Sequence, residues 1–129
     1  MYTIVIAEDE FLIAERIKSL LESAGYHVVG VAANAAEMLA LADRNRPSVA
    51  ILDVRLDGAI DGTTLAGHLD LSYGSQIVFV TGDPLYARRQ TDNRRYQVLA
   101  KPFSDEELLQ AVATACAMHA RQGKAARSA

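Results

Sequence analysis

The segment Val49-Ala50-Ile51-Leu52-Asp53 is a short apolar run that ends in an acid. Pro47 precedes it, and a run of this length and composition is typical of a strand buried on both faces of a sheet. Similar β-branched or apolar runs recur along the chain, with enough residues between successive runs for a helix. They cover residues 3–7, 27–31, 77–80 and 97–99.

Helical periodicity fills most of the intervals between these runs. In the first interval, Ile13, Ile17, Leu20 and Leu21 recur on one helix face, and Gly25 supplies a stop. The later intervals show similar signals: Asn34 as the cap of a helix to Ala42, a helix from about Gly62 to Leu71, and Ser104 with Glu107 as a capping box.

Two segments carry weaker helical signals. Pro84 can open a helix, but the residues after it are strongly polar as far as Arg95, so we expect a short, mobile helix. After His119 the periodicity is lost. We therefore expect one domain over residues 1–120 and a disordered tail over residues 121–129.

Five strands that alternate with five helices predict a doubly wound α/β fold, a parallel sheet with helices on both faces. In open sheets of this kind, ligands bind beyond the carboxyl ends of the strands. Four of the predicted strands end in polar residues: Glu8-Asp9-Glu10, Asp53, Thr81-Gly82 and Lys101-Pro102. Taken singly, each has an ordinary explanation, because acids often begin helices and a lysine is usually solvated. Their joint occurrence at these strand ends is not expected by chance.

The acids at two of these strand ends favour a bound cation. Two unit charges about 4 Å apart repel by roughly 4 kcal/mol at an effective dielectric near 20, so gathering Glu8, Asp9 and Asp53 is unfavourable without one. An all-oxygen site with few carboxylates and room for water suits Mg²⁺. The sequence has no His or Cys at these strand ends, which counts against zinc and redox metals.

Composition limits the remaining classes of function. The chain has 129 residues, half of them hydrophobic, and a formal net charge of -3, which suits one domain and argues weakly against nucleic acid as a direct partner. It shows neither a signal peptide nor an apolar run long enough to span a bilayer. We expect a soluble, cytoplasmic protein with no membrane partner.

The single cysteine, Cys116, falls on the apolar face of a predicted helix and is expected to be a buried thiol.

The motifs at the strand ends resemble those of two-component response-regulator receiver domains of the CheY-like, single-domain type, and the resemblance extends to about His119. It implies sheet order 2-1-3-4-5 and phosphoryl transfer from a bacterial histidine kinase. It also implies a signalling switch that catalyses only its own phosphorylation and dephosphorylation, with Mg²⁺ as its cofactor. The motifs are Glu8-Asp9, Ile51-Leu52-Asp53-Val54, Thr81-Gly82 and Lys101-Pro102-Phe103.

The resemblance implies a role for each of these residues. Asp53 is the phosphoryl acceptor, and Thr81 and Lys101 contact phosphoryl oxygens, with Lys101 contacting Asp53 itself before phosphorylation. The Lys101-Pro102 bond is expected to be cis. The metal ligands are expected to be Asp9 and Asp53 directly, the backbone carbonyl of Arg55, and Glu8 through water.

The sequence also departs from the family pattern. Val98 stands where most receivers have an aromatic residue, and Tyr96 lies two residues earlier on the same strand face. The stretch 78–82 partly resembles the Phe-Ala-Thr-Gly motif of single-domain alphaproteobacterial regulators, with Val80 in place of Ala. Asp57 and Asp61 could adjust metal affinity, although turn chemistry explains them more simply.

Output in this family usually uses the fourth helix, the fifth strand and the fifth helix. Here these are the helix opened by Pro84, the strand 97–99 and the helix after Ser104, and a downstream protein target would bind there. The polar composition of residues 86–95 suggests a segment that becomes ordered on phosphorylation.

Several alternatives remain open. A flavodoxin-like flavin binder shares the architecture, but Glu8-Asp9-Glu10 would repel the flavin phosphate. A phosphatase of the haloacid-dehalogenase type would need a second Asp where Arg55 stands. Within the receiver interpretation, the chain could be a phosphate sink that drains its kinase, or a degenerate receiver that acts as a constitutive binding module.

Overall fold

The computed structural model describes residues 2–56, 61–91 and 96–128. Their strands form one parallel sheet in the order β2-β1-β3-β4-β5, which confirms the predicted doubly wound topology. The strands are β1 (Thr3–Ala7), β2 (His27–Ala32), β3 (Val49–Leu52), β4 (Gln76–Thr81) and β5 (Gln97–Ala100). The helices are α1 (Phe11–Ser23), α2 (Ala35–Asn45), α3 (Gly62–Tyr73), α4 (Pro84–Gln90) and α5 (Asp105–Ser128).

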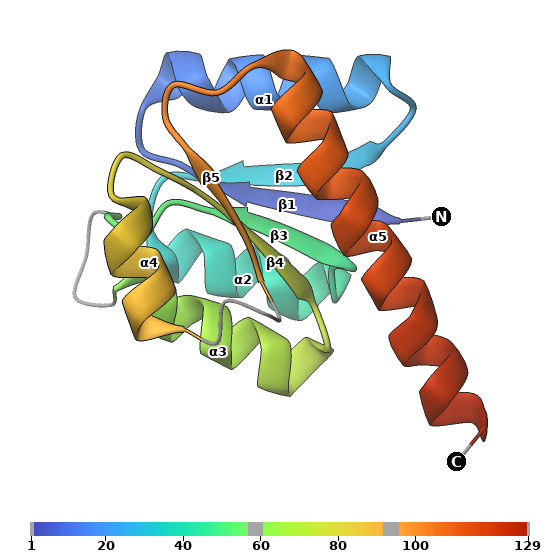
Figure 1. Cartoon of the computed structure of the whole chain (residues 1–129). Helices are drawn as coiled ribbons and strands as arrows, with labels where there is room; N and C mark the ends of the chain where they lie inside the picture. The colour runs from blue at the N-terminus through green and yellow to red at the C-terminus, as the bar shows by residue number, and fades with distance from the viewer. Residues whose placement is uncertain (1, 57–60, 92–95, 129) are drawn as a thin grey trace.

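The helices form two layers, with α1 and α5 on one face of the sheet and α2, α3 and α4 on the other (Figure 1). Ile6 and Leu108 belong to the core on the first face, and Leu52 and Leu65 to the core on the second. Every residue of β3 and β4 is buried. Burial on both faces explains why these strands are continuous apolar runs rather than alternating ones.

Local capping agrees with the sequence. The side chain of Asn34 accepts a hydrogen bond from the Glu37 amide (2.9 Å) and begins α2. Ser104 and Glu107 form the expected capping box, each side chain accepting from the other's backbone N–H (3.1 and 2.9 Å). Cys116 is a buried free thiol, as predicted.

The structure differs from the expected helix boundaries near the C-terminus. Helix α5 continues to Ser128, and its C-terminal end extends beyond the sheet (Figure 1). Gln122 anchors this extension, because its amide donates to the carbonyl of Gly74 (3.2 Å) and accepts from Gln76 Nε2 (2.7 Å). A helix held by contacts distant in sequence is not visible in local periodicity. The division of the chain at residue 120 stays a prediction.

Helix α4 is short, as expected, and ends at Gln90. The end of the polar stretch, residues 92–95, lies outside the described residues. Residues 84–90 are already helical, so α4 does not need an ordering step to form. Among the residues that the structure describes, no helix is both long and apolar enough to cross a bilayer.

Candidate functional site

The carboxyl ends of four strands meet at one edge of the sheet. In the strand register, Ala7 pairs with Leu52, and Thr81 pairs with Ala100. The backbone ladder continues one residue further, because the Asp53 amide donates to the Ala7 carbonyl (3.1 Å) and the Lys101 amide donates to the Thr81 carbonyl (2.9 Å). The fold therefore fixes the candidate residues in place through main-chain bonds.

These strand ends line a cavity of about 480 Å³. Its floor contains the buried residues Asp53 (8% exposed) and Thr81 (1% exposed), and its walls come from the loops that follow the strands. The lining residues are Asp9, Glu10, Asp53, Arg55, Thr81, Gly82, Asp83 and Lys101.

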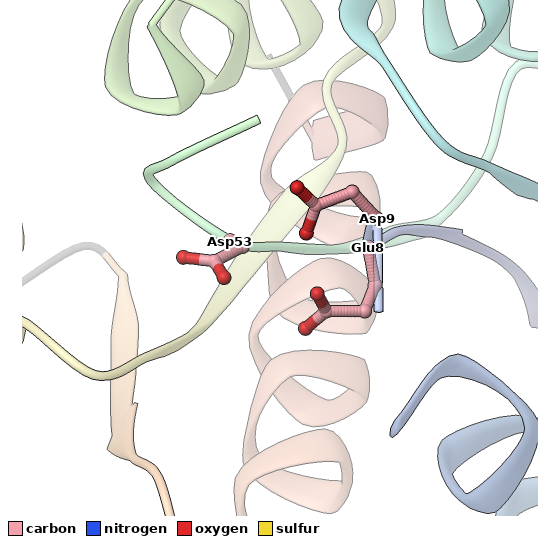
Figure 2. A group of neighbouring side chains, drawn as sticks. All are labelled: Glu8, Asp9 and Asp53. Atoms are coloured by element: carbon pink, nitrogen blue, oxygen red, sulfur yellow. The ribbon is translucent and has the colours of Figure 1, made fainter. Parts of the chain in front are cut away.

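Three acids come together here, as the sequence predicts. Ligand oxygens of Glu8, Asp9 and Asp53 all lie within 4.8 Å of one another, with Glu8 and Asp53 buried and Asp9 exposed. Figure 2 shows their carboxylates grouped at the ends of β1 and β3. Such a group is a suitable ligand set for a hard divalent cation, because it offers oxygen atoms alone and one of its members faces solvent.

Lys101 neutralises part of this negative charge. Its Nζ atom lies 2.7 Å from Oε1 of Glu8, 2.9 Å from Oδ2 of Asp53 and 3.9 Å from Oε1 of Glu10. Burial raises the pKa of Glu8, although its hydrogen bond from Lys101 opposes that shift. Burial lowers the pKa of Lys101, but its bonds to Glu8 and Asp53 outweigh this, so the pKa lies above its ordinary value. The expected contact between Lys101 and unphosphorylated Asp53 is present.

The other oxygen of Asp53 also has a partner. The backbone amide of Arg55 donates to Asp53 Oδ1 (3.2 Å). Thr81 Oγ1 accepts from the Asp83 amide (3.0 Å), which leaves the hydroxyl hydrogen of Thr81 for donation elsewhere. The Lys101-Pro102 peptide bond is cis, as the sequence led us to expect.

Gly62 is a site residue that the sequence did not reveal. A Cβ atom at this position would lie 2.7 Å from the Cα of Val54 and 3.0 Å from the carbonyl carbon of Asp53. The Gly62 amide also donates to the Val54 carbonyl (3.0 Å). The backbone of the candidate acceptor thus packs directly on the first residue of α3. A glycine at the expected start of this helix was the only signal in the sequence.

A second group missed in the sequence joins the two loops at the cavity mouth. Arg55 pairs with Asp83 (2.8 Å), and the Tyr86 hydroxyl donates to Asp61 Oδ2 (2.6 Å). Burial raises the pKa of Asp61, but hydrogen bonds from Thr63 and Tyr86 outweigh it and hold that pKa below its ordinary value. Asp61 also caps α3, in agreement with the turn interpretation. Asp57 lies outside the described residues.

The aromatic residue nearest to the usual family position is held against α3. The ring of Tyr96 packs edge-on against Phe79, with 5.9 Å between ring centroids. Its hydroxyl donates to Oδ2 of Asp70 in α3 (3.0 Å). Tyr96 therefore belongs to the core on that face, and Val98 remains the residue three positions before Lys101.

Comparison with known proteins decides the family. Residues 4–113 match the family model of the response regulator receiver domain. The chain belongs to the response-regulator receiver family. Receiver domains are signalling switches of two-component systems that work with histidine kinases, and phosphorylation-based signalling follows from this membership. The match favours a receiver over the flavin-binding and phosphatase alternatives.

Individual relatives agree with this assignment. The transcriptional regulatory protein BtsR of Salmonella typhi is 31% identical over 109 residues, which is 84% of this receiver chain and 45% of BtsR. The transcriptional regulatory protein PdtaR of Mycobacterium tuberculosis is 32% identical over 111 residues, or 84% of this chain and 54% of PdtaR. The chain thus spans about half the length of these curated relatives.

Solved receivers have the same fold. The receiver domain of a modulated diguanylate cyclase from Desulfovibrio desulfuricans G20 superposes with a TM-score of 0.85 at 29% identity, covering 95% of this chain and 98% of that one. The response regulator PhyR from Brucella abortus superposes with a TM-score of 0.83 at 28% identity, covering 97% of this chain and 51% of that one.

Proposed function

We propose that this receiver accepts a phosphoryl group from a histidine kinase on Asp53, with Mg²⁺, and signals through a protein contact that depends on phosphorylation. The observation that carries the proposal is the position of Lys101, whose Nζ atom bridges Glu8 and Asp53 in a cavity open to solvent. A buried carboxylate held beside a cation and facing a cavity is suited to act as a nucleophile toward phosphorus.

The group transfer follows from the residues around Asp53. A carboxylate oxygen of Asp53 attacks the phosphorus of the kinase phosphohistidine, a new O–P bond forms, and the P–N bond breaks with its electron pair passing to the imidazole nitrogen. The product is an acyl phosphate. Lys101 is placed to contact one phosphoryl oxygen, and the Thr81 hydroxyl has a hydrogen to donate to another.

The acidic group fits the expected metal. Asp9 and Asp53 would hold Mg²⁺ directly, with Glu8 through water and the backbone carbonyl of Arg55, and these assignments stay predictions. When bound, Mg²⁺ neutralises charge on the oxygens of the transferring phosphoryl group.

The surface formed by α4, β5 and α5 is the proposed binding site for a downstream protein. A groove of about 470 Å³ lies between β5 and the first turns of α5, and Val98 and Leu99 contribute apolar surface to it. We also propose that the chain belongs to the Phe-Ala-Thr-Gly subgroup of single-domain regulators, because residues 78–82 partly resemble that motif.

The experiment is phosphoryl transfer from purified histidine kinases, with the wild type compared with Asp53→Asn in the presence and absence of Mg²⁺. We expect transfer to the wild type with Mg²⁺ and none to Asp53→Asn. Rapid loss of phosphoryl groups from the kinase, with no protein that binds the phosphorylated form, would instead favour the phosphate sink. Labelling of Asp53→Asn at the wild-type rate would refute the proposal.

A further inference from the structure

Two loops at the mouth of the cavity are joined side chain to side chain. Arg55, in the loop after β3, donates through Nη2 to Oδ2 of Asp83, the residue before α4 (2.8 Å). The Arg55 guanidinium also lies over the ring of Tyr86, with Cζ 5.7 Å from the ring centroid. The Tyr86 hydroxyl donates to Oδ2 of Asp61, the residue before α3 (2.6 Å). We call Arg55, Asp61, Asp83 and Tyr86 the clasp.

Both acids of the clasp also begin a helix. Asp61 Oδ1 accepts from the amide of Thr63 in α3 (2.6 Å), and Asp83 Oδ1 accepts from the amide of Tyr86 in α4 (3.3 Å). Each carboxylate therefore uses one oxygen to cap a helix and the other to close the clasp. The first turns of α3 and α4 are linked through these four side chains.

The clasp is attached to the acceptor pocket at two points. The Arg55 amide donates to Asp53 Oδ1 (3.2 Å), and the Asp83 amide donates to Thr81 Oγ1 (3.0 Å). The first point is the proposed acceptor itself, and the second is the hydroxyl expected to contact the phosphoryl group. A chemical change at Asp53 therefore reaches Arg55 through one hydrogen bond, and a phosphoryl group contacted by the Thr81 hydroxyl would reach Asp83 through a second one.

We propose that the clasp is closed in the unphosphorylated protein and opens when Asp53 is phosphorylated, which releases the first turn of α4. This inference rests on the proposed phosphorylation of Asp53. A phosphoryl group brings about -1.5 to -2 charges and three acceptor oxygens into a cavity that Arg55 and Asp83 both line. It attracts the guanidinium and repels the carboxylate, so it acts on the two members of the ion pair in opposite directions.

The strength of the existing contacts favours this exchange. The Arg55 side chain is 71% exposed and that of Asp83 39%, and exposed ion pairs contribute little to stability. Hydrogen bonds between Arg and phosphate are among the strong charge-assisted ones. A rotation of the Thr81 side chain toward a phosphoryl oxygen would also move Oγ1 away from the Asp83 amide and lengthen the hydrogen bond between them. Both attachments then act to open the clasp.

The clasp offers a route from phosphorylated Asp53 to α4 that does not need an aromatic residue three positions before Lys101. Val98 holds that position here, and the Tyr96 hydroxyl is hydrogen-bonded to Asp70 in α3. The clasp instead reaches α4 from its first turn, through Asp83 and Tyr86.

The test compares Tyr86→Phe with Tyr96→Phe by hydrogen exchange of the amides in the first turn of α4, with and without beryllofluoride and Mg²⁺ as a phosphoryl mimic. Each substitution removes one hydroxyl bonded to an aspartate and keeps the aromatic ring, but only the first lies in the clasp. Fluorine NMR of the bound beryllofluoride reports separately whether the mimic occupies Asp53.

In the wild type, we expect the mimic to speed exchange in this turn about fivefold, the equivalent of one net hydrogen bond. Tyr86→Phe should exchange at about that faster rate without the mimic and change little when it is added, whereas Tyr96→Phe should behave as the wild type. If the mimic binds but exchange in the wild type does not rise, or if Tyr86→Phe matches Tyr96→Phe, the clasp proposal is overturned and Asp53 remains the acceptor. If the wild type fails to bind the mimic, the proposed function fails and the clasp proposal with it.

Discussion

Lys101 and Glu8 form an ion pair of 2.7 Å, although they follow strands at different positions in the sheet. In the order β1-β3-β4-β5, the lysine after β5 reaches past the ends of β4 and β3 to the acid after β1. The ammonium group thereby lies between two buried carboxylates, where it offsets their repulsion in the absence of a metal ion.

The first prediction removes this cation. Lys101→Met keeps most of the apolar stem but leaves Glu8 and Asp53 buried without their partner. We expect the free energy of unfolding in urea to fall by about 1–3 kcal/mol without Mg²⁺ and to recover in part when Mg²⁺ is added. Lys18→Met, at a residue of α1 that does not line the cavity, should change stability by less than about 0.5 kcal/mol. Equal stabilities for the two variants without metal would contradict the role given to Lys101.

The second prediction concerns the metal ligands. Asp9→Asn should weaken Mg²⁺ binding by at least about tenfold, because it removes a charged oxygen ligand from the acidic group. The neighbouring Glu10→Gln is the matched control, since Glu10 lies outside that group. Its effect should be below about twofold. Isothermal titration of each variant with MgCl₂ measures both, and equal losses would show that net charge rather than coordination governs binding.

The third prediction uses two glycines of one helix. Gly62→Ala places a methyl group against the backbone of Asp53 and Val54, whereas a Cβ at Gly67 meets nothing within 4 Å. We expect Gly62→Ala to destabilise the protein by about 1–3 kcal/mol and to slow phosphorylation. Gly67→Ala should be neutral or stabilising by up to about 1 kcal/mol, since Ala is the better helix former. Thermal unfolding measures the change in stability of each variant, and the rate of phosphorylation measures the effect on Asp53.

The fourth prediction is a dependence of stability on pH. Burial lowers the pKa of His119 below its ordinary value of 6.5, so the folded state disfavours the charged ring. The unfolded chain then binds more protons below pH 6.5, and the contribution of His119 to stability, complete above that pH, is lost as the pH falls. The free energy of unfolding should decrease more between pH 7.5 and 5.5 in the wild type than in His119→Phe. Phe also retains the edge-on contact with Tyr2. Identical decreases would count against this assignment.

Local signals in the sequence were sufficient to predict the alternation of strands and helices and the doubly wound class, whereas the sheet order came from the resemblance to receiver domains. Buried strands such as β3 are continuous apolar runs, and capping residues such as Asn34 lie next to the helices that they begin. The end of α5 could not be predicted in this way. Gln122 stabilises it by bonding Gly74 and Gln76, which are distant in the sequence.

The residues of the candidate site were likewise predicted only in part. Glu8, Asp53 and Lys101 were identified because the fold places every strand end at one edge. The clasp was missed because Arg55 and Tyr86 lie in or next to polar loops, where residue type does not specify a partner. Asp61 was recognised as a turn residue, but its second bond, to Tyr86, depends on how two loops approach each other.

The most direct test of the central claim is the intact mass of the protein after incubation with acetyl phosphate and Mg²⁺. We expect the wild type and the surface control Asp43→Asn to gain the mass of one phosphoryl group, and Asp53→Asn to gain none. Removal of Mg²⁺ with EDTA should abolish the gain in the wild type. A full mass gain in Asp53→Asn, or none in the wild type with Mg²⁺ present, would contradict the assignment of Asp53 as the phosphoryl acceptor.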